Sequence, residues 1–78
     1  MLSNQLLVSR AVRRFMDANH ITQGAIARVL GVNQGQVSAR LRGATRWSLD
    51  DLDRLAAAGV PIVLASTDPE EVATNENR

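Results

Sequence analysis

The sequence predicts a compact, mostly α-helical domain of four to five short helices, and three observations support this fold class. Apolar residues recur at a spacing of three or four over most of the chain, which is the period of an amphipathic helix. A residue that can cap a helix N-terminus precedes each apolar stretch, namely Ser3, Thr22, Asn33 and Ser48. Glycines follow three of the predicted helices, where a left-handed residue commonly ends the last turn.

Length and composition predict a single domain. The chain has 78 residues, and we assign residues 1–65 to the folded domain and residues 66–78 to an acidic, largely flexible tail. It has no cysteine, which excludes disulfides, thiolate zinc sites and cysteine nucleophiles. No apolar run approaches membrane-spanning length and no signal-peptide pattern opens the chain, so we expect a cytoplasmic protein without a membrane partner.

The net charge of +1 conceals a strong asymmetry between the two parts of the chain. Residues 1–49 hold seven arginines and one acidic residue, giving +6, whereas residues 50–78 hold two arginines and seven acidic residues, giving −5. A basic half of this kind is typical of a phosphate-binding surface. All nine basic residues are arginine, which suits bidentate phosphate contacts but is equally expected from a GC-rich genome.

The first predicted helix covers residues 4–18 and begins after the cap residue Ser3. Its apolar stripe consists of Leu7, Val8, Ala11, Val12, Phe15 and Met16. Its other face carries the charged residues Arg10, Arg13, Arg14 and Asp17. This face is either solvated or a surface from which Arg10 or Arg14 contacts phosphates.

Residues 22–43 carry the strongest pattern in the chain, two short helices joined by a tight turn. Thr22 and Asn33 can cap the two helices, and Gly31 lies where the first must end. An apolar residue precedes each cap and can pack on the residue five places later, which fixes the angle at which the chain enters the helix. The inward positions are Ile26, Ala27, Leu30, Val37 and Leu41, with the small Ala27 where the helices cross.

The outward face of the second of these helices is unusual for a helix in solvent. It carries Gln34, Gly35, Gln36, Ser38, Ala39 and Arg42. A solvated face would favour glutamate, lysine and other strong helix formers. Short and amide side chains instead give a slim helix whose glutamines both donate and accept hydrogen bonds, as bidentate recognition of adenine requires. This face therefore suits the major groove of DNA.

At these positions the chain resembles the helix-turn-helix of the lambda-repressor-like (Cro/CI, XRE) family of DNA-binding domains. The matching residues are Gln23, Ala27, Gly31, Val37 and Gly43, and the resemblance extends from Leu6 to about Val63. The family usually has an apolar residue where this chain has Arg40, and often a glutamate where it has Leu41. Here we expect Leu41 to pack inward and Arg40 to lie at the flank.

The resemblance implies a sequence-specific regulator of transcription, a small phage or bacterial repressor of the Cro type. Helix 34–42 would lie in the major groove of a double-stranded DNA operator. Its expected base contacts are Gln34, Gly35, Gln36, Ser38 and Ala39. The expected phosphate contacts are Gln23, Arg10, Arg14, Arg40, Arg42 and Arg46.

Ser48 begins a fourth predicted helix, with Asp51 as its capping-box partner three residues later. Trp47 and Leu52 have the spacing of a hydrophobic staple, so we expect Trp47 to pack in the core rather than to stack on a base. The expected inward residues are Leu49, Leu52, Leu55 and Ala56. The acidic first turn complements the helix dipole but would repel DNA, so this helix should point away from it.

Residues 60–65 fit two structures. The lambda-repressor-like resemblance allows a fifth helix, whereas the β-branched composition between Pro61 and Pro69 favours a strand. A lone strand needs a partner for its backbone groups, so we expect pairing with the same strand of a second subunit. Ile62, Val63 and Leu64 are the expected dimerisation residues of this homodimer.

Nothing in the sequence indicates an enzyme. It has no nucleophile–base pair, phosphate-binding loop or metal-ligand cluster, and its one histidine, His20, lies in a predicted turn where a loop or cap role is expected. We therefore expect no cofactor, no metal and no small-molecule ligand. Two other functions remain open: an antitoxin or excision-directing DNA-binding factor that docks a protein partner, and a helical protein–protein module that does not bind DNA.

Overall fold

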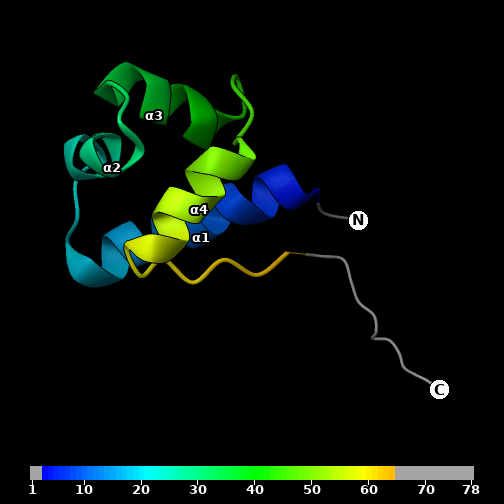
Figure 1. Ribbon diagram of the computed structural model, residues 1–78, viewed down its shortest axis with the longest axis horizontal. Helices are drawn as coiled ribbons and strands as arrows, with labels where there is room; N and C mark the ends of the chain where they lie inside the picture. The colour runs from blue at the N-terminus through cyan, green and yellow to red at the C-terminus, as the bar shows by residue number, and fades with distance from the viewer. Residues whose placement is uncertain (1–2, 65–78) are drawn as a thin grey trace, which may run out of the picture.

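The computed structural model describes residues 3–64, which form four helices and, within that range, no strand. The helices are α1 (Asn4–Asn19), α2 (Gln23–Leu30), α3 (Gln34–Arg42) and α4 (Leu49–Ala57). Figure 1 shows α3 above α1 and α4, with α2 at one end of the assembly. The mostly α-helical fold class is confirmed, and the predicted tail at residues 66–78 lies outside the described residues. No helix in residues 3–64 has both the length and the apolar character needed to cross a membrane.

All four helices begin at the predicted caps. The side chains of Ser3, Thr22, Asn33 and Ser48 each accept a hydrogen bond from a backbone N–H in the first turn of their helix. At the other ends, Gly31 and Gly43 take left-handed conformations with φ of 73° and 82°. His20 does the same at the end of α1 with φ of 55°, and its N–H donates to Met16 O, which confirms the expected cap role.

The core lies where α2 meets α3 and α4 and where α1 meets α3. Its buried apolar residues are Val8, Val12, Ile26, Ala27, Leu30, Val37, Leu41, Trp47, Leu55 and Val60. All five inward positions predicted for residues 22–43 belong to this set. Trp47 is also buried, as expected, and its Nε1 donates to the buried Ser9 Oγ at 2.9 Å.

The prediction for the inward side of α4 is wrong at two positions. Leu49 is 80% exposed and Ala56 is exposed, whereas Leu55 is buried and Leu52 is half-buried. The buried side of α4 is centred near Leu55 and includes Asp51, and a helix turns by about 100° per residue. Leu49 and Ala56 therefore lie about 120° and about 100° from Leu55 around the helix axis.

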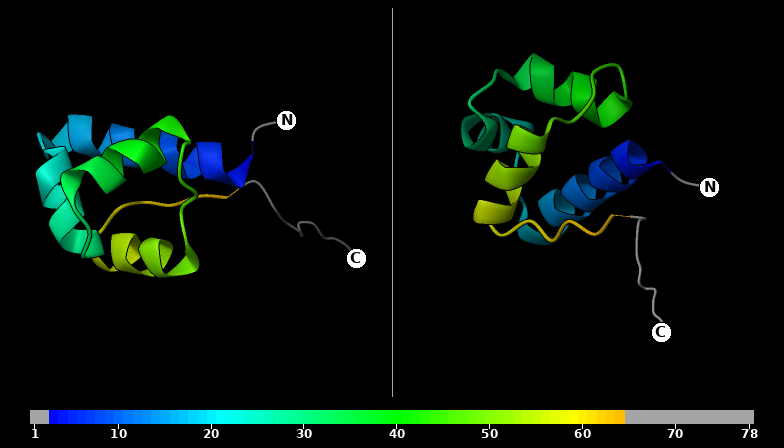
Figure 2. Two further views of the ribbon diagram at one scale, coloured as in Figure 1. Left: turned by 90° about the horizontal axis from the view of Figure 1, so that it is seen from above. Right: turned by 45° about the vertical axis from the view of Figure 1, so that its right-hand side comes forward.

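Residues 60–64 form neither a fifth helix nor a strand within the described part of the chain. They run beside α1 as an extended segment (Figures 1 and 2), held at its start by Val60 N–H donating to Leu55 O at 3.0 Å. Val60 is buried and Ile62 packs partly on the core, which leaves Val63 and Leu64 exposed. Packing of the alternate apolar residues Val60 and Ile62 on the core explains the strand-like composition without any strand pairing.

Candidate nucleic-acid interface

The outward face of α3 is built from small residues. Val37 and Leu41 turn inward and are buried, so the opposite side of the helix is centred on Gly35, Ala39 and Arg42. Gly35 and Ala39 add almost no width to the helix along this line. The predicted groove-facing residues Gln34, Gly35 and Gln36 are exposed at its N-terminal end, and Ser38 and Ala39 are half-buried further along.

The two glutamines of this face differ in their hydrogen bonds. Gln36 Oε1 accepts from Asn33 N–H at 2.9 Å, and Asn33 Oδ1 accepts from Gln36 N–H at 2.8 Å, which forms a capping box. The side-chain oxygen of Gln36 thus already accepts one hydrogen bond within the protein, and its NH₂ group remains as a donor. Gln34 makes no side-chain hydrogen bond to any residue in the range 3–64, so both its donor and its acceptor face solvent. This box was not predicted from the sequence, although the Asn-x-x-Gln spacing of residues 33–36 is typical of one.

Arg42 lies back along α3 rather than beyond its end. Its Nη1 donates to Ser38 Oγ at 2.5 Å, one helical turn toward the N-terminus. The loop that follows α3 places Arg46 beside the same end of the helix, because both arginines border one shallow groove with Leu6 and Gly43. Both side chains are exposed. The structure therefore brings these two predicted phosphate contacts together.

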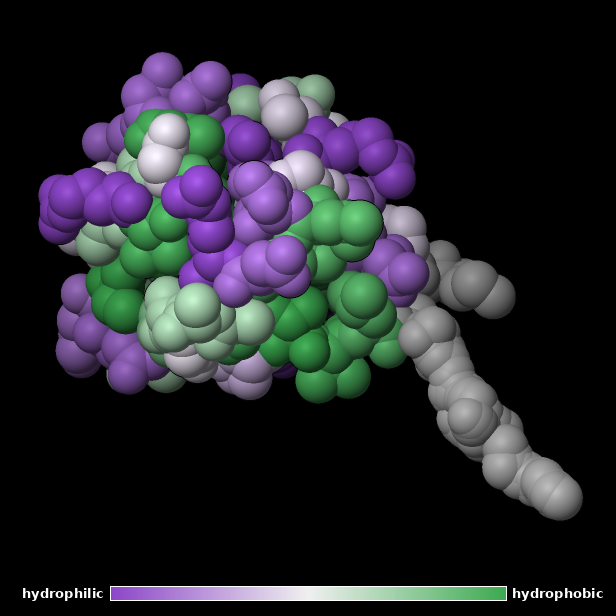
Figure 3. All heavy atoms as spheres, in the orientation of Figure 1, coloured by the Kyte–Doolittle hydropathy of each residue, from purple (hydrophilic) through white to green (hydrophobic). Residues whose placement is uncertain are grey.

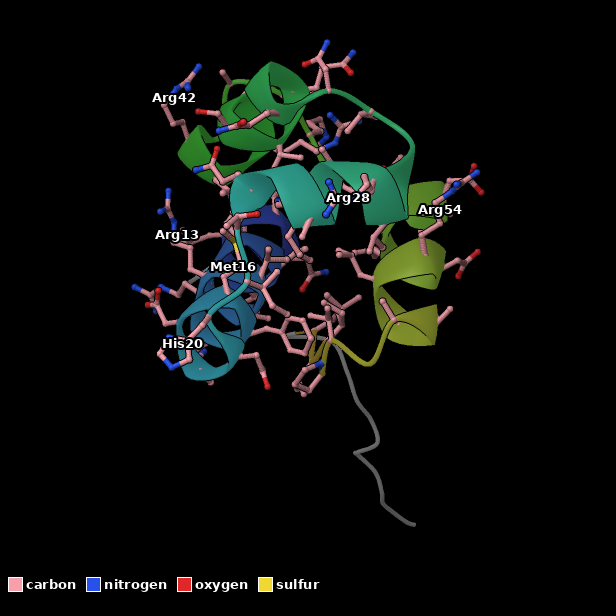
Figure 4. The ribbon with its side chains drawn as sticks, turned by 90° about the vertical axis from the view of Figure 1, so that its left-hand side faces the viewer. Arg13, Met16, His20, Arg28, Arg42 and Arg54 are labelled. Atoms are coloured by element: carbon pink, nitrogen blue, oxygen red, sulfur yellow. The ribbon has the colours of Figure 1, made fainter. Side chains whose placement is uncertain are left out.

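The arginines of α1 lie on two different flanks of that helix. Arg13, next to α3, donates from Nη2 to Leu41 O at 3.2 Å and lies on the same side of the molecule as Arg42 (Figure 4). Arg14 instead borders an apolar groove with Phe15, Pro61 and other residues of α1 and the C-terminal segment. Arg10 is exposed on the outer side of α1.

Arg13, rather than Arg14, therefore lies against α3. Neighbouring positions on a helix point about 100° apart, and Arg14 borders the apolar groove with Phe15 and Pro61. The sequence placed both on the polar side of α1 without indicating which flank would meet α3. The hydrogen bond from Arg13 to Leu41 O shows that the flank with Arg13 meets α3. It also gives a hydrogen-bond donor to a carbonyl in the last turn of α3, where carbonyls have no partner within the helix.

Arg40 differs most from expectation. It was predicted to contact phosphates, yet its Nε donates to Asp51 Oδ2 at 2.8 Å and its side chain is only 13% exposed. Burial acts to raise the pKa of Asp51, but the hydrogen bond from Ser48 N–H and the Arg40 guanidinium outweigh it and hold that pKa below 3.8. Arg40 thus has an acidic partner inside the protein and does not belong with the exposed arginines.

Gln23, the remaining predicted contact, is the first residue of α2 and is half-buried. It follows the cap Thr22, whose Oγ1 accepts from Ala25 N–H at 3.2 Å. Backbone N–H groups at such a helix start, with the positive end of the helix dipole, favour a nearby anion. Gln23 is thus placed where a phosphate oxygen could receive both side-chain and backbone donors.

Taken together, α3 presents a slim polar strip with Arg42, Arg46 and Arg13 around it. Among the described residues, no group of three or more histidine or acidic side chains is placed to hold a metal ion. Comparisons with family models, curated proteins and solved structures find no match to this chain.

Proposed function

We propose that this chain is a sequence-specific, double-stranded DNA-binding repressor of the lambda-repressor-like helix-turn-helix type. In this proposal α2 and α3 form the helix-turn-helix, and α3 lies in the major groove. The observation that carries the proposal is the outward face of α3, where Gly35 and Ala39 keep the helix narrow and exposed glutamines stand at its N-terminal end. A protein of this kind acts on DNA, so we place it in the cytoplasm of a bacterial or phage-infected cell.

The two glutamines take different roles in base recognition. Gln34 has a donor and an acceptor available and can bind adenine at two points. Gln36 already uses its side-chain oxygen in the capping box, so we expect it to act through its NH₂ group and to donate to an acceptor such as guanine O6 or thymine O4. Gly35, Ser38 and Ala39 allow the close approach that both contacts need.

Phosphate contacts would fix the register of the helix in the groove. Arg42 and Arg46 lie at one end of α3, and Gln23 opens α2. Arg13 joins them from the flank of α1 that meets α3, and the exposed Arg10 lies further out. Such contacts release counterions, so the logarithm of the affinity should fall linearly with the logarithm of the salt concentration.

A homodimer would supply the second half of an operator. Val63 is 78% exposed and Leu64 38%, and with Leu49 they form an apolar band that runs from the start of α4 to the C-terminal segment (Figure 3). Ile62 packs on the core of its own chain, so only Val63 and Leu64 of the predicted dimerisation residues are accessible. A dimer would read half-sites about 34 Å apart. Sedimentation that shows a monomer at high micromolar concentration would contradict this part of the proposal.

The apolar band also fits the second candidate function, an antitoxin or excision-directing factor. Three large exposed apolar residues on one small domain are typical of a protein contact. A stoichiometric protein partner that co-purifies with the chain, and that is released by Leu49→Asp but not by Arg42→Ala, would favour this function over a simple repressor.

Selection of bound duplexes from a random-sequence pool tests the proposal without a known operator. The expected result is enrichment of one short motif, present once or as an inverted repeat. A Gln34→Ala and Arg42→Ala double variant, checked for folding by circular dichroism, should lose the enrichment. Retention of DNA without any enriched motif would show that recognition is not sequence-specific, and no retention at low salt would contradict DNA binding altogether.

A further inference from the structure

The last turn of α3 is tied to the start of α4 by an ion pair that solvent barely reaches. Arg40 Nε donates to Asp51 Oδ2 at 2.8 Å, with the two side chains 13% and 6% exposed. The same carboxylate oxygen accepts from Ser48 N–H at 2.9 Å. Arg40 Nη1 also donates to Gln36 O at 3.1 Å, so the guanidinium holds two acceptors on different helices at once.

This ion pair joins two helices that pack mainly on other neighbours. α3 packs against α2 and α1, and α4 packs against α2. Figure 2 shows α3 and α4 as two separate helices joined by the loop at residues 43–48. With no extensive direct packing between them, α3 and α4 are related through their common neighbour α2 and through the side chains that bridge them directly.

The backbone at Arg40 is held as well. Ser9 Oγ on α1 donates to Arg40 O at 3.2 Å, and the same hydroxyl accepts from Trp47 Nε1 at 2.9 Å. Ser9 and Trp47 are both buried. A single residue of α3 therefore contacts α1 through its carbonyl and α4 through its side chain, while the N-terminal turn of α3 is held by its own capping box.

We infer that Arg40 is a positioning residue, which sets the angle at which α3 presents its outward face by bridging to Asp51, and that it is not a phosphate ligand. This inference rests on the proposed function, because the angle matters only if α3 must fit a groove. Several base contacts have to form together, so a small change of angle weakens sequence-specific binding. Contacts of the exposed arginines with phosphates tolerate such a change.

The fork of the guanidinium is essential to this role. Arg40 uses Nε for one acceptor and Nη1 for the other, a planar arrangement that the single ammonium group of lysine cannot reproduce. Arg40→Lys keeps the charge and removes the geometry, whereas Arg40→Met removes both. Arg42→Ala is the matched control, since Arg42 is an exposed arginine two positions further along the same helix.

The test measures the affinity of each full-length variant for a selected duplex and for its shuffled version, over a range of salt concentrations. Arg40→Lys and Arg40→Met should each lose on the order of tenfold affinity for the selected duplex, a change of about 1.4 kcal/mol, and little for the shuffled one. Their salt dependence should match that of the unaltered chain. Arg42→Ala should instead make the slope of log affinity against log salt less steep by about one. An Arg40→Lys variant that is unchanged on both duplexes, or an Arg40→Met variant that is weakened equally on both with a slope less steep by about one, overturns the inference.

A measurement without DNA separates this inference from the proposed function. In two-dimensional NMR spectra, Arg40→Lys and Asp51→Asn should shift the same amide signals along α3 and the first turn of α4, and the double variant should add little to either. Changes confined to the immediate neighbours of each substituted residue would overturn the inference. If the unaltered chain binds no duplex, the proposed function fails, yet this comparison still shows whether the bridge positions α3. Should Arg40→Met unfold, the lysine and asparagine variants carry the test.

Discussion

At the scale of single residues, the informative positions are those whose side chains are already committed inside the protein. Gln36 and Asp51 are each the third residue of a helix, and each accepts a hydrogen bond from the backbone of its cap residue. The sequence indicated the Ser48–Asp51 box through its spacing, but only the structure shows the Asn33–Gln36 box and the ion pair of Asp51 with Arg40. The ion pair could not be predicted, because Arg40 and Asp51 lie on different helices and the sequence pattern does not show which residues of two helices meet.

Substitution of Gln36 separates its two roles. Gln36→Glu keeps an oxygen for the Asn33 N–H but removes the NH₂ donor, so we expect unchanged or slightly higher stability in urea and weaker discrimination at one base pair, by about 1–3 kcal/mol. Gln34→Glu adds the same charge and serves as the matched control, with its loss at a different base pair. Loss of affinity for all duplexes alike in both variants would mean that charge, not base recognition, explains the effect.

The pH dependence of stability should report on Asp51. Because its pKa in the folded chain lies below 3.8, the carboxylate stabilises the fold above that pH, and the contribution is lost as pH falls through the folded-state pKa. We expect the free energy of unfolding to fall on acidification through this window, and to fall less in Asp51→Asn. Asp53→Asn, an exposed position on the same helix, is the control. Equal acid sensitivity in all three chains would refute this assignment.

At the scale of elements, the helices were predictable because local chemistry sets their ends. Caps, staples and glycines act over a few residues, and the structure places α2 and α3 where these signals put them. The inward side of α4 and the fate of residues 60–64 were not predictable, because neighbouring elements decide both. Asp51 rather than Leu49 lies on the buried side of α4, and Val60 and Ile62 pack on the core that the helices form.

Two glycine substitutions test the assigned helix ends. Gly31→Ala places a side chain at φ of 73°, and we expect it to lower the free energy of unfolding by about 1 kcal/mol. Gly24→Ala lies in the first turn of α2, where a Cβ would meet Thr22 Oγ1 at an ordinary 3.7 Å, and should raise stability by up to about 1 kcal/mol. Urea unfolding of both variants gives the comparison. Equal changes in the same direction would contradict the left-handed turn at Gly31.

At the scale of the whole molecule, the sequence predicted the basic half but not how it is divided among surfaces. Arg42, Arg46 and Arg13 surround α3, Arg14 borders the apolar groove beside the C-terminal segment, and Arg40 is paired with an acid. Composition counts these residues alike. Packing of α1 against α3 separates Arg13 from Arg14, and the ion pair with Asp51 separates Arg40 from the exposed arginines. The basic charge could therefore be predicted from the sequence, but not which arginines lie beside α3.

Because the arginines lie on different surfaces, their alanine variants should differ in how DNA affinity depends on salt. The slope of log affinity against log salt is negative, and Arg42→Ala and Arg46→Ala should each make it less steep by about one, because each removes one phosphate contact. Arg14→Ala removes the same charge from the other flank of α1 and should leave the slope unchanged. If Arg14→Ala makes the slope less steep by as much as Arg42→Ala, the DNA must contact a different face of the molecule.

The most direct test of the central claim is the ratio of affinities for the best selected duplex and its shuffled version, measured by fluorescence anisotropy at physiological salt. If α3 reads base edges through Gln34 and Gln36, the ratio should reach about a thousandfold or more. It should collapse toward one in the Gln34→Ala, Gln36→Ala double variant, which leaves the net charge unchanged, while non-specific affinity stays. A ratio near one for the unaltered chain would contradict the account, even if binding to both duplexes were tight.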